Sequence, residues 1–383
     1  MSVTAARGFL ASGLSAGIKG SGDPDLALVV NSGPSDAAAA VFTSNRVQAA
    51  PVRWSRRAVA DGSLSAVVLN SGGANACTGP AGQADARTMA ECTARAVGAE
   101  AGRIAVCSTG LIGVPLPMDR VTAGIDAAAA RLSDEGGEDA AVAIKTTDSV
   151  HKTAVVSGPG WTVGGMAKGA GMLAPGLATM LVVLTTDADV RASELDSALR
   201  EAVRTTFDRV DSDGCMSTND TVLLLASGAS RVRPDPAAFA EAVHGVCLHL
   251  AQRLIADAEG ASKEIEVRVV GAASERDAEE VGRSVARNNL LKCALHGEDP
   301  NWGRVLSAIG TTSAVFDPDR LDVAINGVLV CRDGAAGEPR DTVDLSERQV
   351  TVTVDLRSGT AAATIWTNDL SAAYVHENSA YSS

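Results

Sequence analysis

Aromatic side chains are scarce in this sequence, and so are the features that mark membrane, secreted and nucleic-acid-binding proteins. Only 3% of the 383 residues are aromatic, so a core must be built from Ala, Val, Leu and Ile. The formal net charge of −13 and the lack of aromatic stacking platforms exclude a nucleic-acid-binding protein. No apolar run reaches the ~18 residues of a membrane span, and residues 1–22 lack the basic and apolar regions of a secretory signal.

Metal and phosphate motifs are missing as well. The seven cysteines are scattered, without a C-x-x-C pair, which is typical of reduced and mostly buried thiols in the cytoplasm rather than of disulfides or zinc. The five histidines show no metal-ligand spacing. The chain has no Gly-Lys pair, which excludes a Walker-type phosphate loop. We therefore expect a cytoplasmic protein with no bound metal and no cofactor.

Short apolar runs between Gly-rich turns indicate an α/β protein. The run at residues 180–186 (MLVVLTT) is the strongest signal for a buried strand. A helix is expected to follow it from Ser193, with Asp196 three residues on. Asp235 and Pro236 begin a long helix that is expected to end near Gly260. Further strands are expected at 26–30, 39–42, 66–69, 104–106 and 221–226, with a helix over 82–97.

The pattern changes after residue 262. Ile265, Val267 and Val269 alternate with charged residues, which predicts a sheet with one solvated face. Asn326-Gly327 predicts a hairpin with a two-residue turn. We expect a larger domain at 1–262 and a smaller α+β domain at 263–383, both built of sheets covered by helices.

Two glycine motifs resemble functional sites, but their context argues against them. Residues 13–17 (GLSAG) match the G-x-S-x-G nucleophile elbow, yet they lie too early for a preceding sheet and are expected to form a flexible loop. Residues 169–174 (GAGMLA) resemble a dinucleotide fingerprint, but Pro175 falls where its helix should continue.

A junction at Ala178 and Thr179 carries the strongest chemical signal. A Gly-rich segment with Pro175 ends at Ala178, and a deeply apolar strand begins at Thr179. The Thr179 hydroxyl could attack the unhindered Ala178 carbonyl, and hydrolysis of the resulting ester would free an α-amine with a pKa near neutrality. That amine could then serve as the base for its own hydroxyl. On these residues alone, an ordinary β-branched strand residue after a turn is the favoured alternative.

The junction and other segments resemble the ornithine acetyltransferase family, the bifunctional glutamate N-acetyltransferase/ornithine acetyltransferase. The resemblance covers nearly the whole chain, and its signatures occur in order. They are 70–79 (NSGGANACTG), 107–110 (CSTG), 146–148 (TTD), 164–187 around the junction, 217–221 (STNDT), 257–260 (DAEG), 299–304 (DPNWGR) and 377–383 (ENSAYSS). The ordered set is specific, although each segment by itself could arise by chance.

The resemblance implies an N-terminal-nucleophile-like layered α-β-β-α domain and a function for individual residues. Thr179 would take the acetyl group from N-acetylornithine as an ester and pass it to glutamate. Thr109 and Gly110 would form the oxyanion hole, for which a turn with exposed N–H groups is suited. The substrate-binding positions would be Thr146, Lys168, Thr179, Glu259, Asn378 and Ser383. Without the family, Lys168 would be interpreted as a solvated surface charge, Thr109-Gly110 as a simple turn, and Glu259 equally as a frayed helix end.

The same resemblance implies cleavage into chains 1–178 and 179–383, and a heterotetramer of two α and two β chains. It leaves open acetyl-CoA as a second donor, because the sequence shows no CoA-specific motif. Two rival interpretations come from other classes. One is an amide hydrolase or aminopeptidase on the same self-cleaving fold, in which water completes the second step. The other is a non-catalytic binding protein with an intact bond between Ala178 and Thr179. We have no chemical role for Trp302, which we expect in a packed turn.

Overall fold

The computed structural model describes residues 2–174 and 180–380, which form two compact units. The first comprises Met1–Asp208 and Cys215–Leu254, and the second comprises Arg209–Gly214 and Ile255–Ser382. The first unit thus ends at Leu254, ahead of the boundary expected near residue 262, and the second takes a short segment from the middle of the chain. The assignment of 1–262 and 263–383 as domains of the enzyme stays a prediction.

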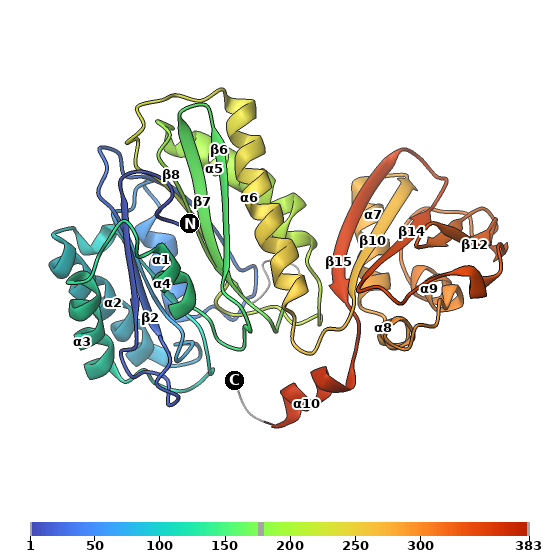
Figure 1. Ribbon diagram of the computed structural model, residues 1–383, viewed down its shortest axis with the longest axis horizontal. Helices are drawn as coiled ribbons and strands as arrows, with labels where there is room; N and C mark the ends of the chain where they lie inside the picture. Colours follow the sequence, from blue (N-terminus) through green and yellow to red (C-terminus); the bar gives the residue numbers. More distant parts are fainter. Residues whose placement is uncertain (1, 175–179, 381–383) are drawn as a thin grey trace. The chain divides into compact units, whose positions relative to one another are not determined.

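The first unit contains two β-sheets (Figure 1). The four-stranded sheet has the order β1-β2-β4-β5, and the five-stranded sheet has the order β3-β9-β8-β7-β6. Each sheet has one parallel pair, β4 with β5 and β8 with β9, and its other neighbours are antiparallel. The strands are β1 (Phe9–Leu14), β2 (Leu26–Asn31), β3 (Ala37–Phe42), β4 (Ala66–Asn70), β5 (Ile104–Ser108), β6 (Lys152–Gly158), β7 (Trp161–Lys168), β8 (Leu181–Thr186) and β9 (Thr221–Ala226).

These sheets pack face to face, and helices cover their outer faces. Val67 of β4 and Val183 of β8 belong to one buried cluster, to which α4 (Gly137–Ala143) contributes as well. Helices α2 (Gly79–Val97) and α3 (Met118–Ala129) share a second cluster with the outer face of the four-stranded sheet. Helices α5 (Ala192–Thr205) and α6 (Pro236–Ala256) lie on the five-stranded sheet, and α1 (Ala50–Ala58) lies against β5 (Figure 1). The predicted layered α-β-β-α class is confirmed.

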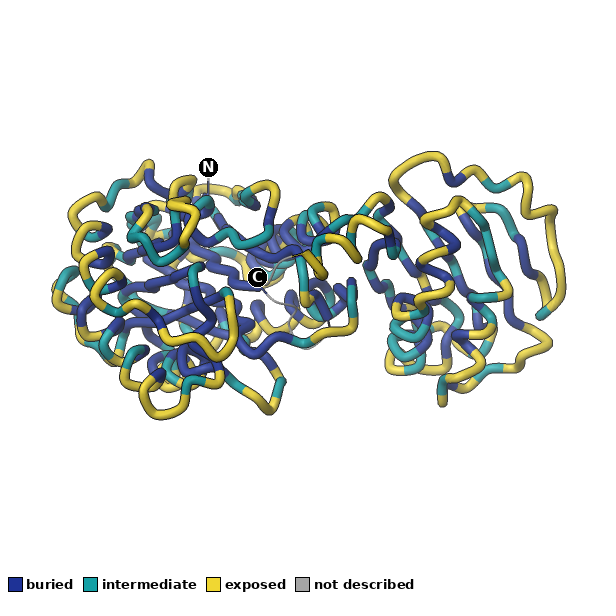
Figure 2. Tube along the Cα trace, turned by 90° about the horizontal axis from the view of Figure 1, so that it is seen from below, coloured by how far each residue is buried: buried dark blue, intermediate teal, exposed yellow. Residues whose placement is uncertain are grey.

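Continuous apolar runs became strands that are buried on both faces. Every residue of β4, β5, β8 and β9 is buried. Figure 2 shows buried backbone in the interior of the chain and exposed backbone mainly at the surface loops. A strand covered by the second sheet on one side and by helices on the other has no solvated face, so it needs no polar alternation. Layering therefore explains why the run at 180–186 gave the clearest signal.

Three local predictions were wrong in detail. Helix α5 begins earlier than Ser193, because Glu194 accepts a hydrogen bond from the Arg191 N–H, while Asp196 pairs with Arg200. Helix α6 begins as predicted, with Asp235 accepting from the first free N–H groups, but ends at Ala256. Gly13 of the G-x-S-x-G match lies inside β1, paired with β2, rather than in a flexible loop.

The second unit is an α+β structure around a six-stranded sheet of order β13-β12-β11-β14-β10-β15. Its strands are β10 (Glu264–Ala272), β11 (Asp322–Ile325), β12 (Val328–Arg332), β13 (Ala335–Ala336), β14 (Gln349–Asp355) and β15 (Ala361–Asn368). The alternating valines of β10 and β14 pack under α7 (Glu275–Ala286), α8 (Asn289–His296) and α9 (Trp302–Ile309). Asn326 and Gly327 form the predicted hairpin turn with positive φ angles. Trp302 begins α9 and packs against this core, so it lies in a helix instead of a turn.

Residues 209–214 belong to the second unit because of charged contacts. The Arg209 guanidinium lies 2.7 Å from carboxylate oxygens of Glu275 and of Glu279 in α7. Arg287 Nε donates to Asp211 Oδ2 at 2.7 Å. The Arg209 and Asp211 side chains are almost completely buried, whereas their partners Glu275 and Arg287 are each 47% exposed.

Candidate active site

The ends of several strands meet at one edge of the first unit. Lys168 at the end of β7 lies opposite Leu181 at the start of β8, and Leu181 is in register with Thr221 at the start of β9. In the other sheet, β4 and β5 end in register at Ser108. The side-chain amide of Asn219, just before β9, donates to the Ser108 carbonyl at 2.8 Å. The loops of both sheets that carry the predicted residues are therefore brought together here.

Thr109 and Gly110 form a tight turn after β5. The Thr109 N–H donates to the Asn70 carbonyl at 2.9 Å, and Thr109 is only 4% exposed. Gly110 has a φ of +127°, and a Cβ there would lie 2.8 Å from the backbone nitrogen of Gly73. The expectation of two exposed N–H groups therefore fails at Thr109. Two hydrogen-bond donors remain at this turn, the Thr109 hydroxyl and the Gly110 N–H. Within the described residues, the Gly110 N–H has no acceptor.

Lys168 is a buried cation. It ends β7, is 1% exposed, and its Nζ donates to Thr109 Oγ1 at 3.2 Å. The alternative of a solvated surface charge is wrong, because the end of β7 is covered by the loops of the four-stranded sheet. A lysine charge this deep requires anionic or polar partners. Its contact with Thr109 leaves the hydroxyl proton of that threonine free to donate elsewhere.

Asp148 is a charged residue of the site to which the sequence analysis gave no role. Its Oδ1 accepts from Lys152 Nζ and from the Gly169 N–H, both at 2.6 Å. Its Oδ2 accepts from the Thr146 N–H at 3.0 Å. Burial alone would raise the pKa of the Asp148 carboxyl, but the charges of Lys168 and Lys152 lower that pKa to about 2. One ionised carboxylate thus fixes the backbone at the predicted substrate-binding residue Thr146 and at Gly169, the residue after the predicted Lys168.

Only part of this arrangement had a signal in the sequence. Asp148 lies in the 146–148 signature and could have been suspected from its motif. Lys152, whose side chain is fully buried against Asp148, stands in an ordinary strand pattern four residues later. A buried lysine is not distinguishable from a surface lysine until its neighbours are known.

Two further predicted residues contact each other in the second unit. Asn378 Nδ2 in α10 (Ala372–Ala380) donates to Glu259 Oε2 at 2.9 Å. Glu259 is 9% exposed and lies after the end of α6 in the loop before β10. A frayed, exposed helix end therefore does not describe it. The predicted residues Ala178, Thr179 and Ser383 lie outside the described residues.

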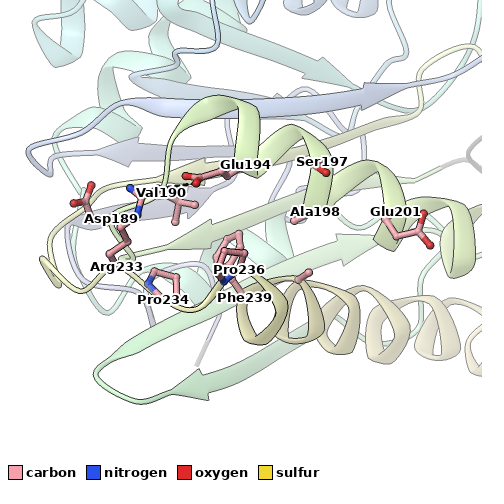
Figure 3. Close-up of a pocket in the computed structure, with 11 residues that line it drawn as sticks. Asp189, Val190, Glu194, Ser197, Ala198, Glu201, Arg233, Pro234, Pro236 and Phe239 are labelled. Carbon is pink, nitrogen blue, oxygen red and sulfur yellow. Dashed lines mark hydrogen bonds and ion pairs between the residues drawn. The ribbon is translucent and has the colours of Figure 1, made fainter.

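The cavity between α5 and α6 is a different site (Figure 3). It has a volume of about 260 Å³, and Ala198 of α5 and Phe239 of α6 give it an apolar lining. Glu194 and Arg233 form an ion pair at its rim, 2.6 Å apart. None of the predicted catalytic or substrate-binding residues lines this cavity. It is therefore not the candidate active site.

Metal-binding clusters and membrane-spanning helices are both absent from the part of the chain that the structure describes. Within 2–174 and 180–380, no three His, Cys, Asp or Glu side chains are grouped so as to hold a metal ion. In the same ranges, no helix combines the length and the apolar character that crossing a membrane requires.

Two helix-covered sheets, with a threonine hydroxyl and a buried lysine in contact at their strand ends, define a layered α/β protein with a buried polar site. The sequence model of the ArgJ family matches residues 10–383, and the chain belongs to this family. The family resemblance drawn from the motifs is thereby confirmed. The chain is an acyltransferase of arginine biosynthesis with two activities, ornithine acetyltransferase and glutamate N-acetyltransferase.

Similar proteins span the full length of the chain. The arginine biosynthesis bifunctional protein ArgJ of Streptomyces avermitilis is 70% identical over 383 residues, covering 100% of both chains. The protein of the same name from Mycobacterium leprae is 58% identical over 389 aligned positions, covering 100% of this chain and 96% of the relative. A solved chain of the ornithine acetyltransferase of Mycobacterium tuberculosis, complexed with ornithine, is 53% identical. It covers 47% of this chain and 96% of its own, with a TM-score of 0.45.

Proposed function

We propose that Thr179 carries the acetyl group between the two substrates as an ester. Its hydroxyl oxygen attacks the acetyl carbon of N-acetylornithine, the C–N bond breaks, and the departing nitrogen takes up a proton to give ornithine. The amine of glutamate then attacks the ester carbon, the C–O bond breaks, and the proton returns to Thr179, giving N-acetylglutamate. The observation that carries this proposal is the buried contact between Lys168 and Thr109, because Lys168 lies opposite Leu181, which follows Thr179 by two residues in the sequence.

The nucleophile would be prepared by self-cleavage. The Thr179 hydroxyl would attack the Ala178 carbonyl and displace its own nitrogen, and water would hydrolyse the ester. Cleavage leaves a carboxylate on Ala178 and a free amine on Thr179, which can accept the hydroxyl proton in each later cycle. The products are chains 1–178 and 179–383. We propose that two copies of each associate as a heterotetramer, as the family resemblance implies.

Thr109 and Gly110 would stabilise the oxyanion of both half-reactions. Each half-reaction passes through a tetrahedral intermediate with a negative oxygen. The Thr109 hydroxyl and the Gly110 N–H are the donors available at the turn. The ammonium of Lys168 polarises that hydroxyl, which strengthens it as a donor. Fixed donors of this kind act without reorganising during the reaction.

Lys168 and Thr146 would bind the anionic part of the substrates. Lys168 is a charge held in a dry environment, where pairing with a carboxylate is strong. Asp148 acts as a positioning residue, because it holds the Thr146 N–H and the Gly169 N–H next to Lys168. Lys152 Nζ lies 2.6 Å from Asp148 Oδ1, so Asp148 has a cationic partner in addition to the nearby charge of Lys168.

Glu259, Asn378 and Ser383 would bind the cationic part of N-acetylornithine. Its side-chain ammonium takes no part in the acetyl transfer, and Glu259 is a carboxylate with an amide partner already in contact. We place the enzyme in the cytoplasm, which the scattered spacing of the seven cysteines, without a C-x-x-C pair, supports. Acetyl-CoA as an additional donor is a separate question, which an assay comparing it with N-acetylornithine would answer.

Mass spectrometry without the acceptor tests the proposal. Enzyme mixed with N-acetylornithine alone should gain about 42 Da on the 179–383 chain, the mass of one acetyl group in ester linkage. Initial-rate plots with both substrates should be parallel, because the first product leaves before glutamate reacts. Intersecting plots with no mass gain would show direct transfer in a ternary complex and overturn the proposal.

A further inference from the structure

The signature at residues 217–221 has no role in the proposed mechanism, yet its residues are all polar and all buried. Their exposed fractions range from 0% to 7%. A buried polar group destabilises a protein unless its hydrogen bonds are satisfied. The segment directly precedes or begins β9, at the edge where the strand ends meet. Its hydrogen-bond partners therefore identify what it holds.

Asn219 is hydrogen-bonded to both sides of the turn at Thr109 and Gly110, the proposed oxyanion donors. Its Nδ2 donates to the Ala74 carbonyl at 2.6 Å and to the Ser108 carbonyl at 2.8 Å. Ser108 is the residue before Thr109, and Ala74 follows Gly73, which bridges to Thr109. The Thr218 hydroxyl donates to Asn219 Oδ1 at 2.6 Å, which fixes the amide in this orientation. One side chain of the five-stranded sheet thus ties both sides of the turn in the four-stranded sheet.

Asp220 holds the residue that follows the nucleophile. Its Oδ1 accepts from the Met180 N–H at 3.0 Å, and Met180 is covalently bonded to Thr179. Asp220 is completely buried, and burial raises the pKa of its carboxyl well above the ordinary value. The hydrogen bond from the Met180 N–H and the charge of Lys168 act in the opposite direction and lower that pKa.

We propose that Asn219 and Asp220 are positioning residues that set the separation between the oxyanion donors and the nucleophile. Asn219 and Asp220 are consecutive residues. One peptide unit therefore connects the hydrogen bond to the Ser108 carbonyl with the hydrogen bond from the Met180 N–H. Misplacing a reacting group by about 0.5–1 Å lowers the rate of an enzyme substantially. A short and rigid connection between the two positions is therefore an effective way to fix their separation. The inference rests on the proposed nucleophile at Thr179 and goes beyond it, because neither residue touches the reacting atoms.

A purely structural role is the alternative, and the chain offers a matched control for it. Asn31 is also an amide that donates to two carbonyls, Ser35 O at 2.9 Å and Ala226 O at 3.2 Å. Ala226 lies at the end of β9, whereas Asn219 precedes its start. Asn31 therefore makes the same kind of tie between the same two sheets, at the opposite end of the same strand.

The test compares Asn219→Ala with Asn31→Ala in processed enzyme. Both should lower the thermal midpoint, because each variant loses two side-chain hydrogen bonds, which are buried at Asn219 and part-buried at Asn31. Only Asn219→Ala should lower kcat, by about ten- to a hundredfold, with KM changed much less. Equal kcat in the two variants would overturn the proposal. If the wild-type chain is active yet uncleaved, the nucleophile assignment fails, while the kcat comparison still decides the role of Asn219.

Asp220 gives an independent test if Asn219→Ala does not fold. Asp220→Ala removes the acceptor for the Met180 N–H and should slow self-cleavage about tenfold or more, followed after synthesis by denaturing electrophoresis. Asp220→Asn restores a carbonyl acceptor of the same shape and should rescue most of the cleavage rate. Two results would show that the hydrogen bond between Asp220 and the Met180 N–H does not position the nucleophile. One is cleavage of Asp220→Ala at the wild-type rate, and the other is a cleavage rate of Asp220→Asn as low as that of Asp220→Ala.

Discussion

The ammonium of Lys168 donates a hydrogen bond to the hydroxyl oxygen of Thr109 across 3.2 Å, joining residues 59 positions apart in the chain. Lys168 ends a strand of one sheet, and Thr109 follows a strand of the other. The contact exists because the two sheets end at the same edge. It links the proposed carboxylate-binding cation to the proposed oxyanion donor, so a substrate bound to the first would lie beside the second.

Replacing the nucleophile should separate cleavage from catalysis. Thr179→Ala should leave one uncleaved, inactive chain, because no hydroxyl remains. Wild type should give fragments of about 18 and 21 kDa on a denaturing gel, by proportion of the 38.8 kDa chain. Thr179→Ser keeps a hydroxyl and should still cleave. A fully active wild-type protein that stays intact would contradict the mechanism.

Removing the buried cation should weaken both half-reactions. Lys168→Ala should lower kcat/KM with N-acetylornithine and with glutamate by roughly ten- to a hundredfold, the usual effect of losing a charge-assisted hydrogen bond. Lys168 precedes the scissile bond in sequence, so the variant must first be shown to be processed. Lys292, another buried lysine, binds the Ser212 carbonyl in the second unit, and Lys292→Ala is the control for removing a buried ammonium. A processed Lys168→Ala enzyme with wild-type efficiency would exclude Lys168 from the site.

Gly110 should not tolerate a side chain. In Gly110→Ala the new Cβ would lie 2.8 Å from the backbone nitrogen of Gly73. This clash could be relieved only by moving the backbone, because no flexible side chain is involved. We expect kcat to fall about 10²–10³-fold, as when an oxyanion donor is displaced. Gly113→Ala is the control, because Gly113 also has a positive φ but its Cβ would meet nothing within 4 Å. Steady-state kinetics should separate them, and a similar kcat in both variants would count against the oxyanion role.

Asp148 should make stability depend on pH in strongly acidic solution. Its pKa is lowered from 3.8 to about 2 in the folded protein, so the unfolded chain binds its proton first as the pH falls. The carboxylate therefore contributes about 2 kcal/mol above pH 4, which is lost as the pH falls through the folded pKa. The free energy of unfolding, measured by urea titration between pH 2 and 5, should show this slope. In Asp148→Asn the slope should be smaller by one proton, and an unchanged slope would refute the assignment.

Much of the fold could be predicted from local patterns in the sequence. The apolar run at 180–186 became part of a strand buried on both faces, and the alternating Ile265, Val267 and Val269 became the buried face of a strand. Asn326-Gly327 formed the expected turn. These features depend on neighbours within a few residues, since side-chain direction follows the period of the local backbone. The ordered motifs identified the family for a similar reason, because each motif is a short continuous segment.

Only the tertiary structure decided which polar groups of the site are buried and what they contact. Examples are the burial of Lys168, the hydrogen-bond partners of Asp148, and those of Asn219 and Asp220. Lys168 has the sequence context of a surface lysine, yet it is 1% exposed because two sheets close over it. Asn219 reaches carbonyls 111 and 145 positions away in the chain. Local periodicity carries no information on such pairs, because register and sheet packing bring distant segments together. The sequence by itself determined the strands, the motifs and the family, whereas the packing of the sheets determined which charges lost their water and which partners replaced it.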